Sequence, residues 1–265
     1  MRRRLKLTLE YDGAAFFGWQ LQARSGERTV QGVLERAFAA LPGTHSRPRA
    51  AGRTDRGVHA IGMVAHCDSD TRVPDAALLR ALNAHLPDDL RVLALERVPD
   101  TFEAQYDCRW RAYRYRLRLA RDDLRGAALE RNRMLFVYER LDVAAMERAA
   151  PLFEGERDFA ALATRETRSG VRRVHLCALT QQGRDLTLHI AADGFLRGMV
   201  RAVVGTLLEV GALKRSPADV PALLDSRKRA RAGENAPPHG LYFVRAGYEP
   251  WREALRETLL AESGV

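Results

Sequence analysis

Residues 111–119 place the firmest limit on the fold of this chain. They read Arg-Ala-Tyr-Arg-Tyr-Arg-Leu-Arg-Leu, so apolar and aromatic residues alternate with arginines. Neighbouring side chains of a strand point to opposite faces, and the pattern therefore predicts a strand with Tyr113 and Tyr115 on one face. The other face is expected to form a positive stripe of Arg114, Arg116 and Arg118. Such a strand needs a sheet in which one face is covered.

The rest of the chain alternates strand and helix patterns. Strands are predicted over residues 4–11, 58–68, 90–98, 172–180, 185–193 and 241–248. Helices are predicted over residues 30–41, 74–86, 142–153 and 195–211, with a short one after Pro217. Thr29 and Asp193 are candidate helix caps, and Pro74 suits a helix start. The class is therefore α/β of the α+β type, with a boundary near residue 105 that separates domains 1–105 and 106–265. Residues 226–239 are predicted to form a basic loop.

The charge of the chain favours a polyanionic partner. Arg and Lys number 43 against 34 Asp and Glu, which gives a formal net charge of +9. RNA, DNA and an anionic membrane surface are all candidates on this ground. A GC-rich coding bias is the alternative, since only three of the basic residues are lysines. Such a bias explains arginine in place of lysine, but not the excess of positive charge.

The cysteines and the N-terminus predict a cytoplasmic protein. Cys67, Cys108 and Cys177 are three and widely spaced, which disfavours a disulfide framework or a cysteine-rich zinc site. The basic start at residues 1–4 is followed by an alternating strand pattern instead of an apolar segment, and no apolar run is long enough to span a membrane.

The most unusual segment is Ala51-Gly52-Arg53-Thr54-Asp55-Arg56-Gly57-Val58-His59-Ala60. Its two glycines bracket an acid that lies between two arginines. Glycines allow a close backbone approach to a ligand, and flanking guanidinium groups favour an ionised carboxylate. Asp55 could therefore act as a nucleophile or a base. The alternative is an ordinary polar turn with surface ion pairs.

A second segment of interest runs from Asp193 to Arg201. Arg197 and Arg201 are four residues apart and would lie at the edge of an apolar helix face, beside a strip of small residues that includes Gly198 and Gly205. Such a strip suits close packing or the approach of a ligand. A core helix with two arginines that reach solvent explains the pattern equally well. Tyr113 and Tyr115 could likewise stack on a base or simply fill a core.

Taken together, these segments resemble the bacterial tRNA pseudouridine synthase A family. The resemblance covers nearly the whole chain. Its blocks, in order, are Tyr11-Asp12-Gly13, Phe17-Gly18-Trp19-Gln20, Thr29-Val30-Gln31, Gly52 to His59, Asn83-Ala84-His85-Leu86-Pro87, Phe102-Glu103-Ala104-Gln105, Arg111-Ala112-Tyr113-Arg114-Tyr115, Phe195 to Arg201 and Gly240-Leu241-Tyr242. The order and spacing of the blocks carry the resemblance more than any single one.

The resemblance implies a role for each matching residue. Asp55 corresponds to the essential aspartate, Tyr113 to the tyrosine against the target base, and Arg201 to the arginine that pairs with the carboxylate. Arg53 corresponds to an arginine implicated in base flipping. Arg168 resembles an arginine of an RNA-contacting loop, and Arg197 is a further candidate for RNA contact. Two positions depart from the family, which often has His at the position of Gly198 and Asn at that of Asp193.

The implied activity is the isomerisation of uridine to pseudouridine at positions 38, 39 and 40 in the anticodon arm of tRNA. The implied fold has two similar subdomains, a mixed and mostly antiparallel sheet flanked by helices, and a central active-site cleft. The reaction requires no cofactor and no metal, and the family forms homodimers. Two rival classes are a non-catalytic tRNA-binding paralogue and a hydrolase that uses the carboxylates of Asp12 and Asp55.

Overall fold

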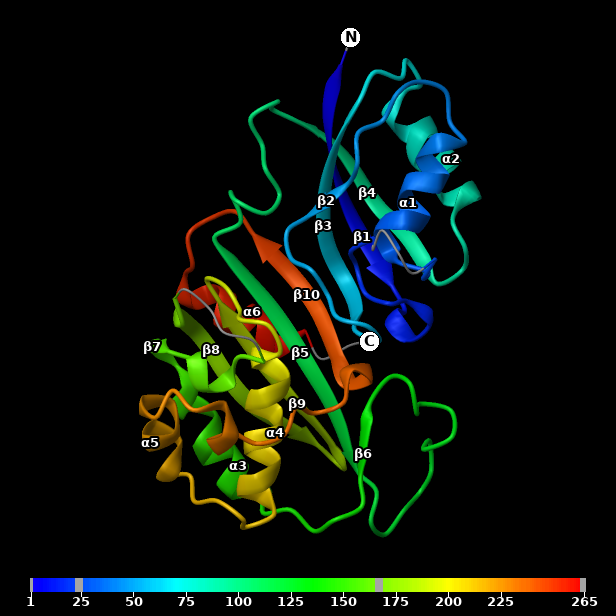
Figure 1. Ribbon diagram of the computed structural model, residues 1–265. Helices are drawn as coiled ribbons and strands as arrows, with labels where there is room; N and C mark the ends of the chain where they lie inside the picture. The colour runs from blue at the N-terminus through cyan, green and yellow to red at the C-terminus, as the bar shows by residue number, and fades with distance from the viewer. Residues whose placement is uncertain (1, 22–25, 165–168, 263–265) are drawn as a thin grey trace. The chain divides into compact units, whose positions relative to one another are not determined.

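The computed structural model describes residues 2–21, 26–164 and 169–262. The chain divides into two compact units (Figure 1). Unit 1 contains Met1–Cys108 together with Tyr242–Tyr248. Unit 2 contains Arg109–Leu241 together with Glu249–Val265. One strand near the C-terminus thus belongs to unit 1, which otherwise consists of the N-terminal part of the chain.

The sheet of unit 1 has the strand order β4-β1-β3-β10, and the short strand β2 pairs with β3. The bounds are β1 Arg3–Tyr11, β2 Arg49–Ala50, β3 His59–Ser69, β4 Leu90–Val98 and β10 Leu241–Gly247. β1 is antiparallel to both β3 and β4, whereas β10 is parallel to β3. Leu5, Leu7 and Leu9 are fully buried, as the alternation in the first predicted strand requires.

Two helices lie beside the sheet of unit 1 (Figure 1). They are α1 Val30–Ala39 and α2 Asp75–His85. The Thr29 side chain accepts a hydrogen bond from the backbone N–H of Gly32 at 3.2 Å, so the predicted cap of α1 is confirmed. Leu34 and Phe38 are both buried on the apolar face of α1. The periodicity of the sequence is therefore sufficient to place both helices.

The sheet of unit 2 has the strand order β5-β9-β8-β7, and β6 pairs with β5. The bounds are β5 Trp110–Leu119, β6 Leu135–Val137, β7 Gly155–Asp158, β8 Val171–Gln182 and β9 Asp185–Ala192. β5, β9, β8 and β7 are antiparallel to their neighbours in this order, and β6 is parallel to β5. A mixed and mostly antiparallel sheet structure with flanking helices is thus confirmed.

The helices of unit 2 lie on both sides of these strands. Figure 1 shows α4 in front of the strands and α6 behind them. The bounds are α3 Val143–Ala149, α4 Met199–Gly211, α5 Asp219–Asp225 and α6 Glu253–Ala261. Single 3-10 turns follow α3 and precede β8. The sequence patterns did not predict α6, β2, β6 or β7, which are short. Only Leu259 of α6 is buried. None of the helices in the described ranges combines the length and the apolar character that a membrane crossing demands.

The three arginines predicted to form a positive stripe on β5 do not form a solvent-exposed one. Arg114 is buried, and Arg116 and Arg118 are half-buried. Arg114 is only 4% exposed, and its guanidinium donates to the backbone carbonyl of Glu262 just beyond α6. Arg118 is tied to the carboxylate of Asp185, its partner on β9. Burial lowers the pKa of Arg114 below its usual value, since a charged guanidinium loses hydration there. Arg114 is covered by the segment around Glu262, near the C-terminal end of the chain. The local pattern of β5 cannot predict a contact with so distant a segment.

The predicted helix over residues 195–211 begins four residues later than expected. Gly198 has a left-handed φ of +75° and precedes the first helical residue, Met199. Asp193 is therefore not a helix cap, and its Oδ1 instead accepts from the backbone N–H of Arg173 at 3.1 Å. Arg197 also lies outside the helix, so the predicted pair with Arg201 on one helix face is wrong. The left-handed φ at Gly198 is the physical reason, because helical geometry cannot continue through it.

Residues 226–239 form a packed connection that contains the 3-10 turn Arg229–Arg231 and leads into another at Pro238–Gly240. A Cβ added to Gly205 of α4 would lie 1.7 Å from the backbone oxygen of Glu234, so only glycine permits this approach. The backbone N–H of Ala236 donates to the Arg201 carbonyl at 3.0 Å. The small-residue strip of α4 thus serves close packing at Gly205.

Candidate functional site

The Asp55 loop lies against residues 16–19 through backbone hydrogen bonds within unit 1. The N–H of Trp19 donates to the Thr54 carbonyl at 3.1 Å, and that of Gly57 donates to the Phe16 carbonyl at 3.2 Å. The loop closes on itself where the N–H of Val58 donates to the Asp55 carbonyl at 3.2 Å. Asp55 itself is half-buried. The backbone on both sides of this carboxylate is therefore fixed in position.

Gly18 and Tyr11 complete the support of this loop. Gly18 has a left-handed φ of +85°, and an added Cβ would lie 2.5 Å from the Thr54 carbonyl oxygen. Glycine is thus required at this position by both conformation and space. The Tyr11 and Thr54 hydroxyl groups form a buried hydrogen bond of 2.9 Å. The sequence indicated these residues only as members of the resembling blocks, and their support of Asp55 was missed.

His59 anchors the other end of the loop. Its Nδ1 accepts a hydrogen bond from the backbone N–H of Gly13 at 3.0 Å and lies 3.2 Å from Oδ1 of Asp12. Its ring stacks on Tyr242 of β10 at a centroid distance of 4.6 Å. Oδ1 of Asp12 also accepts from the N–H of Ala14 at 3.0 Å. The Asp12 carboxylate therefore organises the turn after β1, and this is a structural role that the two-carboxylate hypothesis did not foresee.

Two arginines flank Asp55 in the loop, and Arg28 lies over the Phe16 ring. Arg53 and Arg56 are both exposed, and the guanidinium carbon of Arg56 lies 4.2 Å from the centroid of the Phe17 ring. Arg28 lies over the Phe16 ring at 4.1 Å and pairs with Asp89 through two hydrogen bonds of 2.6 and 2.7 Å. The Phe17 ring thus holds the guanidinium group of Arg56, and the Phe16 ring and the Asp89 carboxylate hold that of Arg28. The result is a positively charged surface beside Asp55 that suits a polyanion.

Tyr113 lies on β5 of unit 2 and is half-buried. Its ring meets that of Phe195 edge to face, with centroids 5.0 Å apart and an interplanar angle of 83°. Such a contact helps to fix the plane of the Tyr113 ring. Tyr115, on the same strand face, is fully buried and donates to the Pro237 carbonyl at 2.9 Å. Tyr115 is therefore a core residue, whereas Tyr113 keeps an exposed part that a base could reach.

Arg201 lies in the first turn of α4. Its Nε donates to the Ala236 carbonyl at 2.5 Å, and its own carbonyl accepts from the Ala236 N–H at 3.0 Å. Burial raises the pKa of Tyr115 well above its usual value, and the charge of Arg201 opposes that shift. Arg201 therefore lies close to the tyrosine face of β5. Its Nε thereby holds the 226–239 segment.

The remaining site predictions divide between the two units. Arg53 and Asp55 belong to unit 1, whereas Tyr113, Arg197 and Arg201 belong to unit 2. Arg197 is exposed, and its carbonyl accepts from the N–H and the hydroxyl of Thr164 at 2.9 and 3.0 Å. Arg168 lies outside the described residues. Within the ranges that the structure describes, no group of three or more His, Cys, Asp or Glu is placed to hold a metal ion.

Comparisons with known proteins agree over nearly the whole chain. A family model described as tRNA pseudouridine synthase matches residues 8–107 and 149–249, which include Asp55 and Arg201. The chain is 46% identical over 252 residues to tRNA pseudouridine synthase A of Thermus thermophilus, which covers 93% of this chain and 97% of that protein. It is 38% identical to the protein of the same name from Caldicellulosiruptor bescii, covering 93% of this chain and 100% of the relative. For the Bradyrhizobium diazoefficiens protein of this name the identity is 42%, with coverage of 92% and 99%. The chain therefore belongs to the tRNA pseudouridine synthase family.

Proposed function

We propose that this protein isomerises uridine to pseudouridine at positions 38, 39 and 40 in the anticodon stem-loop of tRNA. The observation that carries the proposal is the full-length similarity to relatives named tRNA pseudouridine synthase A. The local structure supports it, because Asp55 lies on a loop whose backbone is held from both sides. A carboxylate held in this way needs little reorganisation before it acts on a substrate.

The reaction breaks the C1′–N1 glycosidic bond and joins C5 of the same uracil to C1′. The proton on C5 leaves and N1 gains one, so atoms and electrons balance without an oxidant or an added group. Asp55 must be ionised whether it acts as nucleophile or as base. Arg201 is proposed to favour that ionised form through its positive charge. Asp55 acts directly on the uridine, and Arg201 acts through Asp55.

The target uridine has to leave its stack, which costs a few kcal/mol. Tyr113 is proposed to support the extruded uracil by stacking, and its edge contact with Phe195 keeps the ring in a defined plane. Arg53 is exposed beside Asp55 and is proposed to fill the space that the base vacates. Arg168 and Arg197 are proposed to contact the RNA backbone. The net charge of +9 supports a polyanionic substrate.

Two further properties belong to the same proposal. The protein is proposed to act in the cytoplasm as a homodimer that binds the tRNA anticodon arm across both subunits. The cytoplasmic location is tested by cell fractionation, which shows in which fraction the enzyme is found. The homodimer is tested by light scattering, which gives the mass of the protein in solution with and without tRNA. A monomer that turns over tRNA at the full rate would contradict the dimer.

The deciding experiment measures tritium release from tRNA that carries C5-tritiated uridine. The expected result is release of the label from positions 38, 39 and 40, and a transcript with cytidine at these positions is the control. Equal release from the control transcript would contradict the assigned positions. Binding of tRNA without any release would favour the alternative, a catalytically inactive tRNA-binding paralogue.

A further inference from the structure

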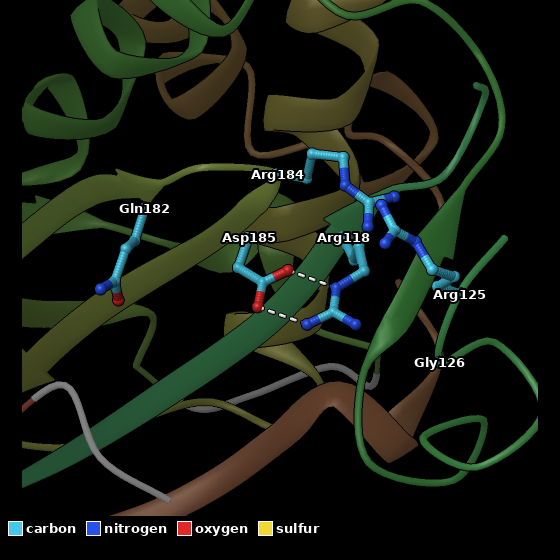
Figure 2. Close-up of a pocket in the computed structure, with 6 residues that line it drawn as sticks. All are labelled: Arg118, Arg125, Gly126, Gln182, Arg184 and Asp185. Atoms are coloured by element: carbon cyan, nitrogen blue, oxygen red, sulfur yellow. Dashed lines mark hydrogen bonds and ion pairs between the residues drawn. The ribbon is translucent and has the colours of Figure 1, made fainter. Parts of the chain in front are cut away.

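A hollow of about 420 Å³ lies at one end of the sheet of unit 2, around the Arg118–Asp185 ion pair. Its lining comes from the end of β5, the segment that follows it and the turn between β8 and β9. Figure 2 shows these residues: Arg118, Arg125, Gly126, Gln182, Arg184 and Asp185. Three of the six are arginines, and only one is an acid. The hollow is therefore a candidate binding site for an anion.

Ion pairs hold the three guanidinium groups in place. Arg118 makes two contacts with the Asp185 carboxylate, from Nε and from Nη2, the second at 2.6 Å (dashed in Figure 2). Arg125 and Arg184 share Asp123, with Nη2 of each at 2.5 and 2.9 Å from Oδ2. Nη1 of Arg184 also donates to the Asp123 carbonyl at 2.7 Å. Two carboxylates, those of Asp185 and Asp123, thus hold the three arginines.

The ion pairs favour the ionised form of both acids. Hydrogen bonds from Arg125 hold the pKa of Asp123 well below its usual value, and those from Arg118 do the same for Asp185. Three guanidinium groups face two carboxylates, which leaves one positive charge. Arg116 and Glu130 act on the same cluster with opposite signs. Arg116 and Glu130 carry opposite formal charges, so they leave the count of one net positive charge unchanged.

Each of the three guanidinium groups also has N–H donors that the ion pairs do not use. Within the described part of the chain, the ion pairs use Nε and Nη2 of Arg118 and Arg125 and Nη2 of Arg184. Nη1 of Arg184 donates to the Asp123 backbone carbonyl. An arginine has five N–H groups on three nitrogens, so Nη1 of Arg118 and Arg125 and Nε of Arg184 remain as donors. The amide of Gln182, which also lines the hollow, is a further donor. Several donors around one positive centre are suited to the oxygens of a phosphate.

The position of the hollow separates it from Tyr113. Arg118 and Tyr113 are five residues apart on β5, so their side chains leave opposite faces of the strand. At the usual rise of a strand they are also about 17 Å apart along its axis. A uridine that stacks on Tyr113 and a group in the hollow cannot therefore be neighbours in the RNA. A single ligand reaches both only if it is large enough to extend around the edge of the sheet.

We infer that the hollow binds a backbone phosphate of the tRNA that lies outside the anticodon arm. This inference rests on the proposed function, because it takes the RNA to be the substrate of the same chain. Arg125 is highly exposed and Arg184 half-exposed, so both can be reached by a phosphate on the surface. The hollow would add affinity for the whole tRNA, and would leave the chemical step unchanged.

The test compares the full chain with its Arg125→Gln/Arg184→Gln variant. Binding to full-length tRNA and to an isolated anticodon stem-loop is followed by fluorescence anisotropy over a salt series. For full-length tRNA we expect an affinity loss of about 3- to 10-fold and a salt slope that is shallower by about 1, which is the effect of one lost phosphate contact. For the stem-loop, and for kcat at saturating tRNA, we expect no change.

Two controls separate the geometry of the hollow from bulk charge. Arg148→Gln/Arg157→Gln removes two exposed arginines from the same unit, and we expect it to weaken full-length tRNA binding much less. Gly126→Ala keeps every charge but places a Cβ 2.7 Å from Nη1 of Arg118, at a φ of +87°. We expect this variant to weaken full-length tRNA binding as well. The thermal unfolding midpoint of each variant verifies that it is folded.

Four results would overturn the inference. The first is unchanged binding of full-length tRNA by the double variant, even if calorimetry shows that the wild type takes up inorganic phosphate there. The second is an equal loss for the isolated stem-loop. The third is an equal loss in the Arg148/Arg157 control. The fourth is a change in the oligomeric state of the double variant by light scattering, which would assign the hollow to contact with another copy. If the wild type releases no tritium from tRNA, the proposed function fails instead, and these binding results are read separately.

Discussion

The hydroxyl groups of Tyr11 and Thr54 lie 2.9 Å apart, and both side chains are buried. Tyr11 ends β1, and Thr54 immediately precedes Asp55 in the loop. The bond therefore connects the sheet of unit 1 to the residue beside the proposed catalytic carboxylate. Its role is to position Asp55, since neither hydroxyl is itself the proposed reacting group.

Thr54→Val removes this bond while preserving the shape of the side chain. We expect a loss of about 1 kcal/mol in the free energy of unfolding, and a decrease in kcat on the order of tenfold with little change in KM. Denaturant unfolding and steady-state tritium release measure the two effects. Thr54→Ser, which keeps the hydroxyl, should recover most of kcat. If Thr54→Val lowered stability alone, the contact would be structural and would not position Asp55.

Asp55→Ala is expected to abolish pseudouridine formation and to leave tRNA binding largely intact. The carboxylate is needed for the chemical step, whereas the surrounding arginines supply the attraction to phosphates. Tritium release and anisotropy with full-length tRNA test the two parts independently. Measurable turnover by this variant would exclude Asp55 as the catalytic residue.

Tyr113→Phe is expected to keep the fold, the edge contact with Phe195 and most of the affinity for tRNA. It should still lower the turnover rate, because the variant lacks the hydroxyl. Tyr113→Ala, which removes the ring, should cost more, since a base that stacks on an aromatic ring gains about 1–3 kcal/mol. Rates under single-turnover conditions give the comparison. A Tyr113→Phe enzyme with full activity would limit the hydroxyl to a minor role.

His189 is expected to make unit 2 less stable at acid pH. Burial, together with the neighbouring charge of Arg114, lowers its pKa to about 4. The Thr180 hydroxyl lies 3.2 Å from Nε2, and the backbone of Leu259 is also a hydrogen-bond partner of the ring. The imidazole is thus neutral in the folded protein at pH values where it is already protonated in the unfolded chain.

The direction of the pH dependence follows from the difference between the pKa of His189 in the folded and in the unfolded state. Above an unfolded pKa of about 6.5 both states are neutral, and stability is complete. As the pH falls from about 6.5 to about 4, the unfolded chain binds a proton that the folded one does not, at a cost of up to about 3 kcal/mol. The unfolding midpoint should therefore decrease between pH 7 and pH 5. His189→Gln should flatten this dependence, and the exposed His85→Gln should not. The same slope in both variants would remove His189 as its cause.

Much of the fold follows from local patterns in the sequence. The alternation of Leu5, Leu7 and Leu9 places β1 and its buried face. The side chain of Thr29 caps α1 as predicted. Each of these features depends on a few neighbouring residues, and a periodic pattern reports it directly. The resemblance of the sequence blocks to tRNA pseudouridine synthase A is confirmed in the same way by comparison with relatives along the chain.

The sequence by itself determined most of the strands and helices, the family and the residues proposed to act on uridine. Only the tertiary structure decided the environment of those residues. It buries Arg114 under the end of α6, ties Arg118 to Asp185, and delays α4 until Gly198 has turned the chain. It also brings Tyr11 to Thr54, 43 residues further along the chain. The physical reason is that burial, hydrogen bonds and the local charge of a residue depend on which distant segments come together. The periodicity of one segment does not predict which other segments will contact it.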